Sequence, residues 1–138
     1  MRAFTTHTTA VALDLDSKWI DNLLTHNQID GCIRVRQGVG RKLTPQGVLH
    51  VAVIAELTRS LRIPVRVACD VARELLTPAA AKQPGSPPDV ALLEVSPSLA
   101  IRLDLDALDR SITPRLALAV ETARRPRRGR PPAGPPTR

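Results

Sequence analysis

Aromatic residues are almost absent from this chain, because Phe4 and Trp19 are the only two among its 138 residues. A hydrophobic core must therefore be built from alanine, valine, leucine and isoleucine. Rings on which unpaired bases could stack are also missing. A protein that grips single-stranded nucleic acid or RNA is therefore not expected.

Long apolar runs are missing as well. Val48–Leu57, the most apolar stretch, is interrupted by His50 and Glu56. It is far shorter than the roughly 20 residues that cross a membrane. The first twenty residues carry no apolar leader of the secretory kind. These absences predict a cytoplasmic protein without membrane contact.

The residue types that carry catalysis and metal binding are few and scattered. Cys32 and Cys69 lie 37 positions apart, and the histidines at positions 7, 26 and 50 share no ligand spacing. No glycine-rich phosphate loop, nucleophile motif or paired-carboxylate site stands in the sequence. We expect two buried free thiols, no metal site, no cofactor and no enzymatic activity.

Acidic residues are missing from the end of the chain, which makes the charge uneven. Residues 124–138 contain six arginines and no acid, and so carry +6 of the net charge of +7. Residues 1–76 carry +3, and residues 77–123 carry −2. A nearly neutral body with a basic tail favours a polyanionic partner, most often nucleic acid.

Composition divides the chain into four parts. Residues 1–76 form a first domain, and residues 77–88, rich in proline, alanine, glycine and serine, form a linker. Residues 89–123 are patterned as a β-hairpin followed by a helix. Residues 124–138 lack apolar side chains large enough for a core and are expected to be disordered. The predicted fold class is mainly α with small β.

Two short helices separated by a tight turn open the first domain. The first is expected from Thr6 or His7 to Leu13. Asp16 is a good N-cap for the second, which is expected over Ser17–Thr25. The apolar face of this second helix consists of Ile20, Leu23 and Leu24. Its other side should face solvent, and the pair is typical of a helix-turn-helix unit.

A small cationic hairpin is expected at residues 31–42. Apolar residues alternate there with charged ones around the turn Gln37–Gly40. The cations are Arg34, Arg36, Arg41 and Lys42, with no acid between them. These charges would repel one another unless a polyanion lies beside them.

Longer elements follow. Thr44-Pro45 starts a helix to about Ser60, and Pro64 opens another to Leu76. The apolar stripe of the latter is expected to be Val67, Ala68, Val71, Ala72 and Leu75. After the linker, strands Val90–Val95 and Leu99–Leu105 precede a helix from about Asp106. Thr113-Pro114 marks a restart or kink in it.

The order of elements over residues 5–76 resembles the DNA-binding domain of the MerR family of transcription regulators. Leu15-Asp16-Ser17-Lys18 stands where that family opens its recognition helix. Arg41-Lys42-Leu43-Thr44 corresponds to the Arg-x-Tyr-Ser that closes the wing and caps the third helix. Leu57–Ile63 resembles the family's Leu-Arg-x-Leu-Gly-Phe turn. The resemblance implies a winged helix-turn-helix fold that binds double-stranded DNA, but no effector site, since a short β–α unit follows here.

The tail contains a second motif. Pro126–Pro131, with the sequence Pro-Arg-Arg-Gly-Arg-Pro, matches the AT-hook. Its glycine lets the backbone approach the floor of a narrow minor groove, and the flanking arginines point along the negative potential of A/T-rich DNA. The residues assigned to this contact are Arg127, Arg128, Gly129 and Arg130.

In a winged helix-turn-helix the second helix enters the major groove and the wing contacts phosphates. The exposed side of the second helix offers Ser17, Lys18, Asp21 and Asn22. Lysine suits guanine or phosphate, and asparagine suits adenine. The residues assigned to phosphates are Arg34, Arg36, Arg41 and Lys42. Trp19 either packs against the wing or the first helix, or wedges against the sugar-phosphate backbone.

The sequence therefore predicts a nucleoid-associated, sequence-specific transcription regulator that binds double-stranded DNA. Residues 89–123 carry more apolar surface than a unit of that size can bury, so a homodimer formed through them is expected. Two alternatives stay open. One is an antitoxin-type protein that covers a partner protein through this unit and autoregulates its operon. The other is an architectural or recombination accessory factor that bends DNA.

Overall fold

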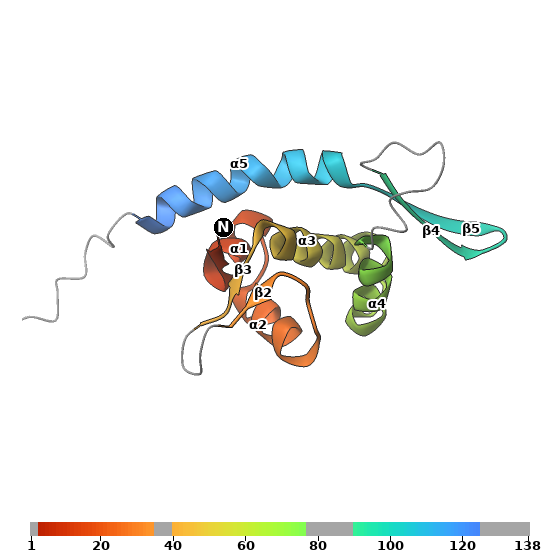
Figure 1. Ribbon diagram of the computed structural model, residues 1–138, viewed down its shortest axis with the longest axis horizontal. Helices are drawn as coiled ribbons and strands as arrows, with labels where there is room; N and C mark the ends of the chain where they lie inside the picture. Colours follow the sequence, from red (N-terminus) through yellow and green to blue (C-terminus); the bar gives the residue numbers. More distant parts are fainter. Residues whose placement is uncertain (1–2, 35–39, 77–89, 125–138) are drawn as a thin grey trace, which may run out of the picture.

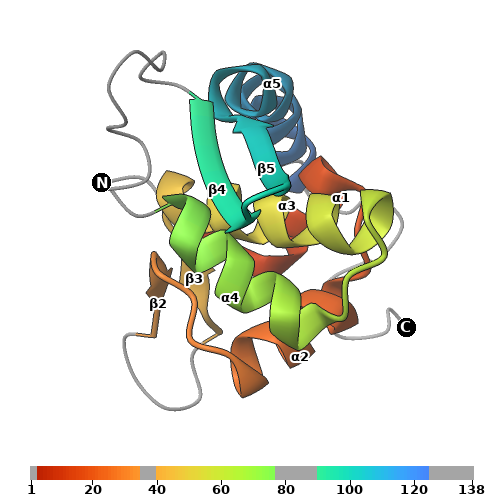
Figure 2. The same ribbon diagram turned by 90° about the vertical axis from the view of Figure 1, so that its right-hand side faces the viewer.

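The computed structural model describes residues 3–34, 40–76 and 90–124. These residues form five helices and two small antiparallel sheets, so the protein is mainly α-helical with little β-structure, as the sequence predicts. Helices α1 (Thr6–Leu13) and α3 (Pro45–Ser60) occupy the middle of the molecule. Helix α2 (Ser17–His26) lies on one side of them and α5 (Leu105–Arg124) on the other (Figure 1, Figure 2).

Local signals place the turn between α1 and α2. Helix α1 ends at Leu13, and its C-cap, Asp14, has a φ of 55° that redirects the chain. Asp16 caps α2, because its Oδ1 accepts a hydrogen bond from the backbone N–H of Lys18 (3.0 Å). Both helices and this cap agree with the prediction, and α2 is one residue longer. Arg59 of α3 donates to the carbonyl oxygen of Asp14 (2.7 Å) and so holds the turn on α3.

The cationic hairpin is present as two short antiparallel strands, β2 (Cys32–Ile33) and β3 (Lys42–Leu43). A further strand, β1 (Phe4–Thr5), pairs with the other edge of β3. The sequence does not predict β1, since two residues are too few to show a period. Residues 35–39, which hold Arg36 and most of the predicted turn, lie outside the described residues. We call residues 32–34 and 40–43 the arm.

A close backbone contact anchors the arm to α3. The hydroxyl of Thr44 caps α3 by accepting from the N–H of Gly47 (3.1 Å), and the N–H of Thr44 donates to the carbonyl oxygen of Gly31 (2.8 Å). Gly31 has a φ of +88°, and a Cβ there would lie 2.5 Å from the Gly47 nitrogen. A Cβ on Gly47 would lie 2.7 Å from the Gly31 oxygen. Both positions therefore require glycine.

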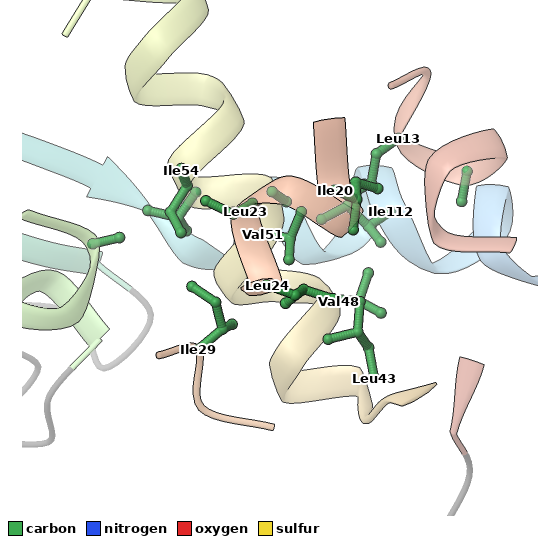
Figure 3. Close-up of a cluster of buried hydrophobic side chains, with 14 of the residues drawn as sticks. Leu13, Ile20, Leu23, Leu24, Ile29, Leu43, Val48, Val51, Ile54 and Ile112 are labelled. Atoms are coloured by element: carbon green, nitrogen blue, oxygen red, sulfur yellow. The ribbon is translucent and has the colours of Figure 1, made fainter. Parts of the chain in front are cut away.

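Helix α3 is the central element of the core, as its apolar residues predict. Four of its side chains, Val48, Val51, Val53 and Ile54, are fully buried. Figure 3 shows side chains from α1, α2, β3 and α5 converging around this helix. Those labelled in the figure are Leu13, Ile20, Leu23, Leu24, Leu43 and Ile112. The core is thus mostly aliphatic, as the shortage of aromatic residues requires.

Helix α4 (Val65–Leu76) buries three of the five residues that the sequence predicts for its apolar stripe. Its buried residues are Ala68, Cys69, Ala72 and Leu75. Val67, expected in the apolar stripe, is 49% exposed, and Val71 is half-buried. The predicted stripe spanned a wide arc of the helix, and α3 covers only the part of it centred on the two alanines. Val67 is left at the rim.

The rest of the described chain is a β-hairpin and a long helix. Strands β4 (Val90–Ser96) and β5 (Leu99–Asp104) pair antiparallel, with a bulge between Glu94 and Ser96. Helix α5 continues through Pro114 without the restart that the sequence suggested. Proline removes one backbone donor, but Arg110, whose carbonyl loses that donor, is exposed, so water can satisfy the freed carbonyl. None of the described helices is apolar over a length that could cross a membrane.

The hairpin and α5 pack on the first domain of the same chain. Helix α5 lies along α1, and β4 lies against α4. Ile112, Leu116 and Ala119 of α5 are buried in the same core as α3. Much of the apolar surface from which the sequence predicted a homodimer is therefore covered within one chain.

His50 is a buried titratable group in the middle of α3. It is 2% exposed, and its Nε2 has no hydrogen-bond partner among the described residues. Burial lowers the pKa of His50; Asp30 works against this lowering, and Arg73 adds to it. The unfolded chain takes up this proton near pH 6.5, whereas the folded chain does so only at lower pH. Between these two values the unfolded state binds more protons.

The stability that depends on neutral His50 should therefore be complete above about pH 6.5. The free energy of unfolding should decrease as the pH falls below this value. Urea unfolding followed by circular dichroism over this range measures the effect. His50→Leu should remove this part of the pH dependence. Equal pH dependence in the wild type and in His50→Leu would contradict the assignment.

Candidate nucleic-acid interface

Helix α2 is amphipathic and presents its polar side to solvent. Ile20, Leu23 and Leu24 are buried against the core, and Asp16 fixes the start of the helix. The polar side carries the four predicted residues. Lys18, Asp21 and Asn22 are exposed, and Ser17 is half-buried. Because Lys18 and Asn22 are four residues apart, they lie on the same face of the helix.

The arm is joined to α2 by a short chain of hydrogen bonds. Arg41 donates from Nη1 to the hydroxyl oxygen of Thr25 (3.1 Å). The Thr25 hydroxyl donates to the backbone carbonyl oxygen of Asp21 (2.7 Å). The strand that follows α2 in the chain is β2, but the side-chain bond to α2 comes from Arg41, just before β3. One surface therefore holds both the polar side of α2 and Arg41 of the arm.

Three of the four predicted arm cations, Arg34, Arg41 and Lys42, lie in the described residues. Arg34 and Lys42 are exposed, and Arg41 is half-buried against Thr25. Burial raises the pKa of the Cys32 thiol, whereas the positive charges of Arg41 and Arg34 act to lower it. Both charges are therefore near this thiol. Cys32 is only half-buried, which corrects the expectation of two buried thiols; Cys69 is buried.

Trp19 lines an open hollow between α2 and the start of α4. The hollow has a volume of about 560 Å³, and its walls include Trp19, Asn22 and His26 from α2 and Val65 and Arg66 from α4. Trp19 is half-buried and packs against the edge of the core. Of the two alternatives that the sequence left open, this geometry favours packing. Its neighbour across the hollow is α4, which sequence analysis did not consider.

Arg66 and His26 are polar residues that sequence analysis did not assign to this surface. Both are exposed and border the hollow beside Asn22. Their sequence signal is weak, because each is simply a polar residue on the outer face of a helix. Only the packing of α4 beside α2 brings them together.

The charges of this surface are arranged in three zones. Within residues 14–25, the exposed carboxylates of Asp14, Asp16 and Asp21 outnumber the single cation, Lys18. A phosphate backbone would be repelled by this central zone. The flanking zones are cationic, with Arg41 and its neighbours of the arm on one side and Arg66 on the other. A duplex could therefore place base edges against α2 and its phosphates against the flanks.

This surface lies on the side of the molecule opposite to α5. In both views α2 lies at the bottom and α5 at the top, and in Figure 1 α1 and α3 lie between them (Figure 1, Figure 2). The hairpin and α5 therefore leave the polar side of α2 uncovered. The predicted AT-hook residues, Arg127, Arg128, Gly129 and Arg130, lie outside the described residues, as does Arg36. No family model, curated protein or solved structure matches this chain.

Proposed function

We propose that this protein is a sequence-specific transcription regulator that binds double-stranded DNA through a MerR-like winged helix-turn-helix. In this proposal α2 enters the major groove, where Lys18 and Asn22 read base edges. The arm is the wing and contacts phosphates through Arg34, Arg41 and Lys42. The tail residues 127–130 lie in the minor groove of adjoining A/T-rich sequence.

The observation that carries the proposal is the hydrogen bond between Arg41 and Thr25. A helix with an exposed polar side occurs in many proteins and by itself indicates no partner. Here the exposed side is bound laterally to a cationic arm, and the arm is fixed to α3 at Gly31. In this proposal the base-reading groups of α2 and the phosphate-binding groups of the arm are thereby held in a fixed arrangement, a rigid frame. Such a frame lets phosphate contacts position the reading helix.

The proposal predicts strongly salt-dependent binding to duplex DNA. If six to eight cations of the full chain neutralise phosphates, the logarithm of the affinity should fall against the logarithm of the salt concentration with a slope of roughly −5 to −7. Fluorescence anisotropy of a labelled genomic duplex over a salt series measures this slope. Selecting bound fragments from the genome first supplies the duplex and shows the symmetry of its site.

A chain ending at Ala123 tests the tail separately. The truncation removes six arginines, of which the proposal places only the three of the motif on DNA. The slope should therefore be smaller in magnitude by about three. Binding should persist, because α2 and the arm are unchanged. A full-length slope near zero would overturn the proposed function. An unchanged slope after truncation would overturn the minor-groove part alone.

A further inference from the structure

An apolar groove opens where the β4–β5 hairpin meets the corner between α3 and α4. Its volume is about 640 Å³. Four of the most exposed large aliphatic residues in the described chain line it together. They are Leu61 (54% exposed), Val67 (49%), Val95 (54%) and Leu99 (58%). Single exposed aliphatic residues are ordinary, but a contiguous group of them marks a contact surface.

The groove contains both a projecting part and a hollow. Val95 and Leu99 flank the turn of the hairpin and project from it, while Leu61 and Val67 form the facing wall on the helical corner. A two-fold interface uses the same patch on both chains, so the patch must be complementary in shape and charge to a second copy of itself. A hairpin tip beside a hollow meets this condition, because each tip can enter the hollow of the other copy.

The charges beside the groove also fit a second copy. Arg102 lines the groove, and Glu94 is exposed one step nearer the hairpin turn. The register pairs Glu94 with Ala100 and Leu92 with Arg102, so the two charged side chains lie on the same face of the hairpin. Each copy thus offers one acid and one base. A two-fold contact can join Arg102 of each chain to Glu94 of the other.

The position of the groove suits two chains on one duplex. The hairpin and α4 lie at one end of the molecule, whereas α2 faces its lower side (Figure 1). A two-fold axis through the groove, running vertically in that view, would keep both α2 helices on the same side. The sequence predicts dimerisation through residues 89–123, and the part of this surface on α5 is partly covered by α1. At the hairpin end, Val95 and Leu99 are not covered by any of the described residues.

We propose that this groove is the homodimer interface, in which the hairpin tip of each chain fills the groove of a second copy. Leu99 is the central anchor, and Arg102 and Glu94 form the pairs at its rim. The use of the dimer, to span two half-sites, rests on the proposed DNA binding. The dimer itself does not, and it can be measured without DNA.

Sedimentation velocity of the full chain at micromolar concentration tests the proposal. The chain has a mass of 15.0 kDa, and the sedimenting species should have twice that mass. Leu99→Glu should raise the dimer dissociation constant about 100-fold, because an anchor is lost twice per dimer. Val11→Glu is the matched control, since Val11 is 52% exposed on α1, outside the groove, and should leave the dimer intact.

Charge reversal provides a second test, which does not require that the protein folds with a glutamate at position 99. Arg102→Glu alone should weaken the dimer about tenfold, and Arg102→Glu combined with Glu94→Arg should restore it. A monomeric wild type, or a dimer that persists in Leu99→Glu, would overturn the inference. Salt-independent DNA binding by a protein that dimerises as described would instead refute the proposed function and leave this interface standing.

Discussion

Gly31→Ala is expected to lower the free energy of unfolding by about 3 kcal/mol. An alanine at a positive φ costs about 1–2 kcal/mol, and Gly31 has a φ of +88°. Its Cβ would also lie 2.5 Å from Thr44 Oγ1 and 2.7 Å from the Gly47 Cα. These neighbours belong to the cap and first turn of α3, so relief of the clash must displace either the cap or the arm. The midpoint of thermal unfolding should fall by about 10 °C.

Gly40→Ala is the matched control for this substitution. Gly40 lies at the other end of the arm, where an added Cβ would meet no atom of the described residues within 4 Å. Its effect on the free energy of unfolding should stay within about 0.5 kcal/mol. Circular dichroism during heating compares the two variants. Similar melting points for both would show that the contact between Gly31 and Gly47 is not what holds the arm on α3.

The second large effect concerns the proposed DNA binding. The double substitution Arg34→Ala with Lys42→Ala should weaken binding of duplex DNA about 30-fold at roughly 0.15 M salt and reduce the magnitude of the salt slope by about two. Both side chains are exposed on the arm, and neither forms a hydrogen bond or ion pair that stabilises the described fold in the way that Arg41 does. The fold should therefore survive the change.

Arg110→Ala with Arg115→Ala removes the same amount of charge from α5, on the opposite side of the molecule. This control should weaken binding less than about threefold, because distant charges are screened at this ionic strength. Fluorescence anisotropy over a salt series separates the two variants. If both lowered the affinity equally, net charge and not a localised wing would explain the binding.

Helix limits in this protein depend on residues close to them, and for that reason the sequence predicts them well. Asp16 caps α2 and Thr44 caps α3, each through a hydrogen bond to a residue two or three positions ahead. Pro45 follows the second cap at the first helical position. The polar face of α2 was likewise predictable, because Ile20, Leu23 and Leu24 leave one side of the helix without apolar residues.

The surroundings of that face could not be predicted in the same way. Arg41 and Thr25 are 16 residues apart, and nothing in the local sequence indicates that one side chain binds the other. Arg66 comes beside Asn22 only because α4 packs next to α2. The apolar stripe of α5 predicted that something would cover Ile112 and Leu116, but not that α1 of the same chain would do so.

The sequence by itself determined the local order of this protein: where helices begin, which of their sides are apolar, and where positive charge accumulates. These properties arise from interactions over a few residues, which capping groups and periodic side chains encode directly. The tertiary structure decided the rest: the added strand β1, the bond from the arm to α2, the burial of α5 and the open groove at the hairpin. An apolar face must be buried somewhere, but its own pattern does not specify the surface that covers it.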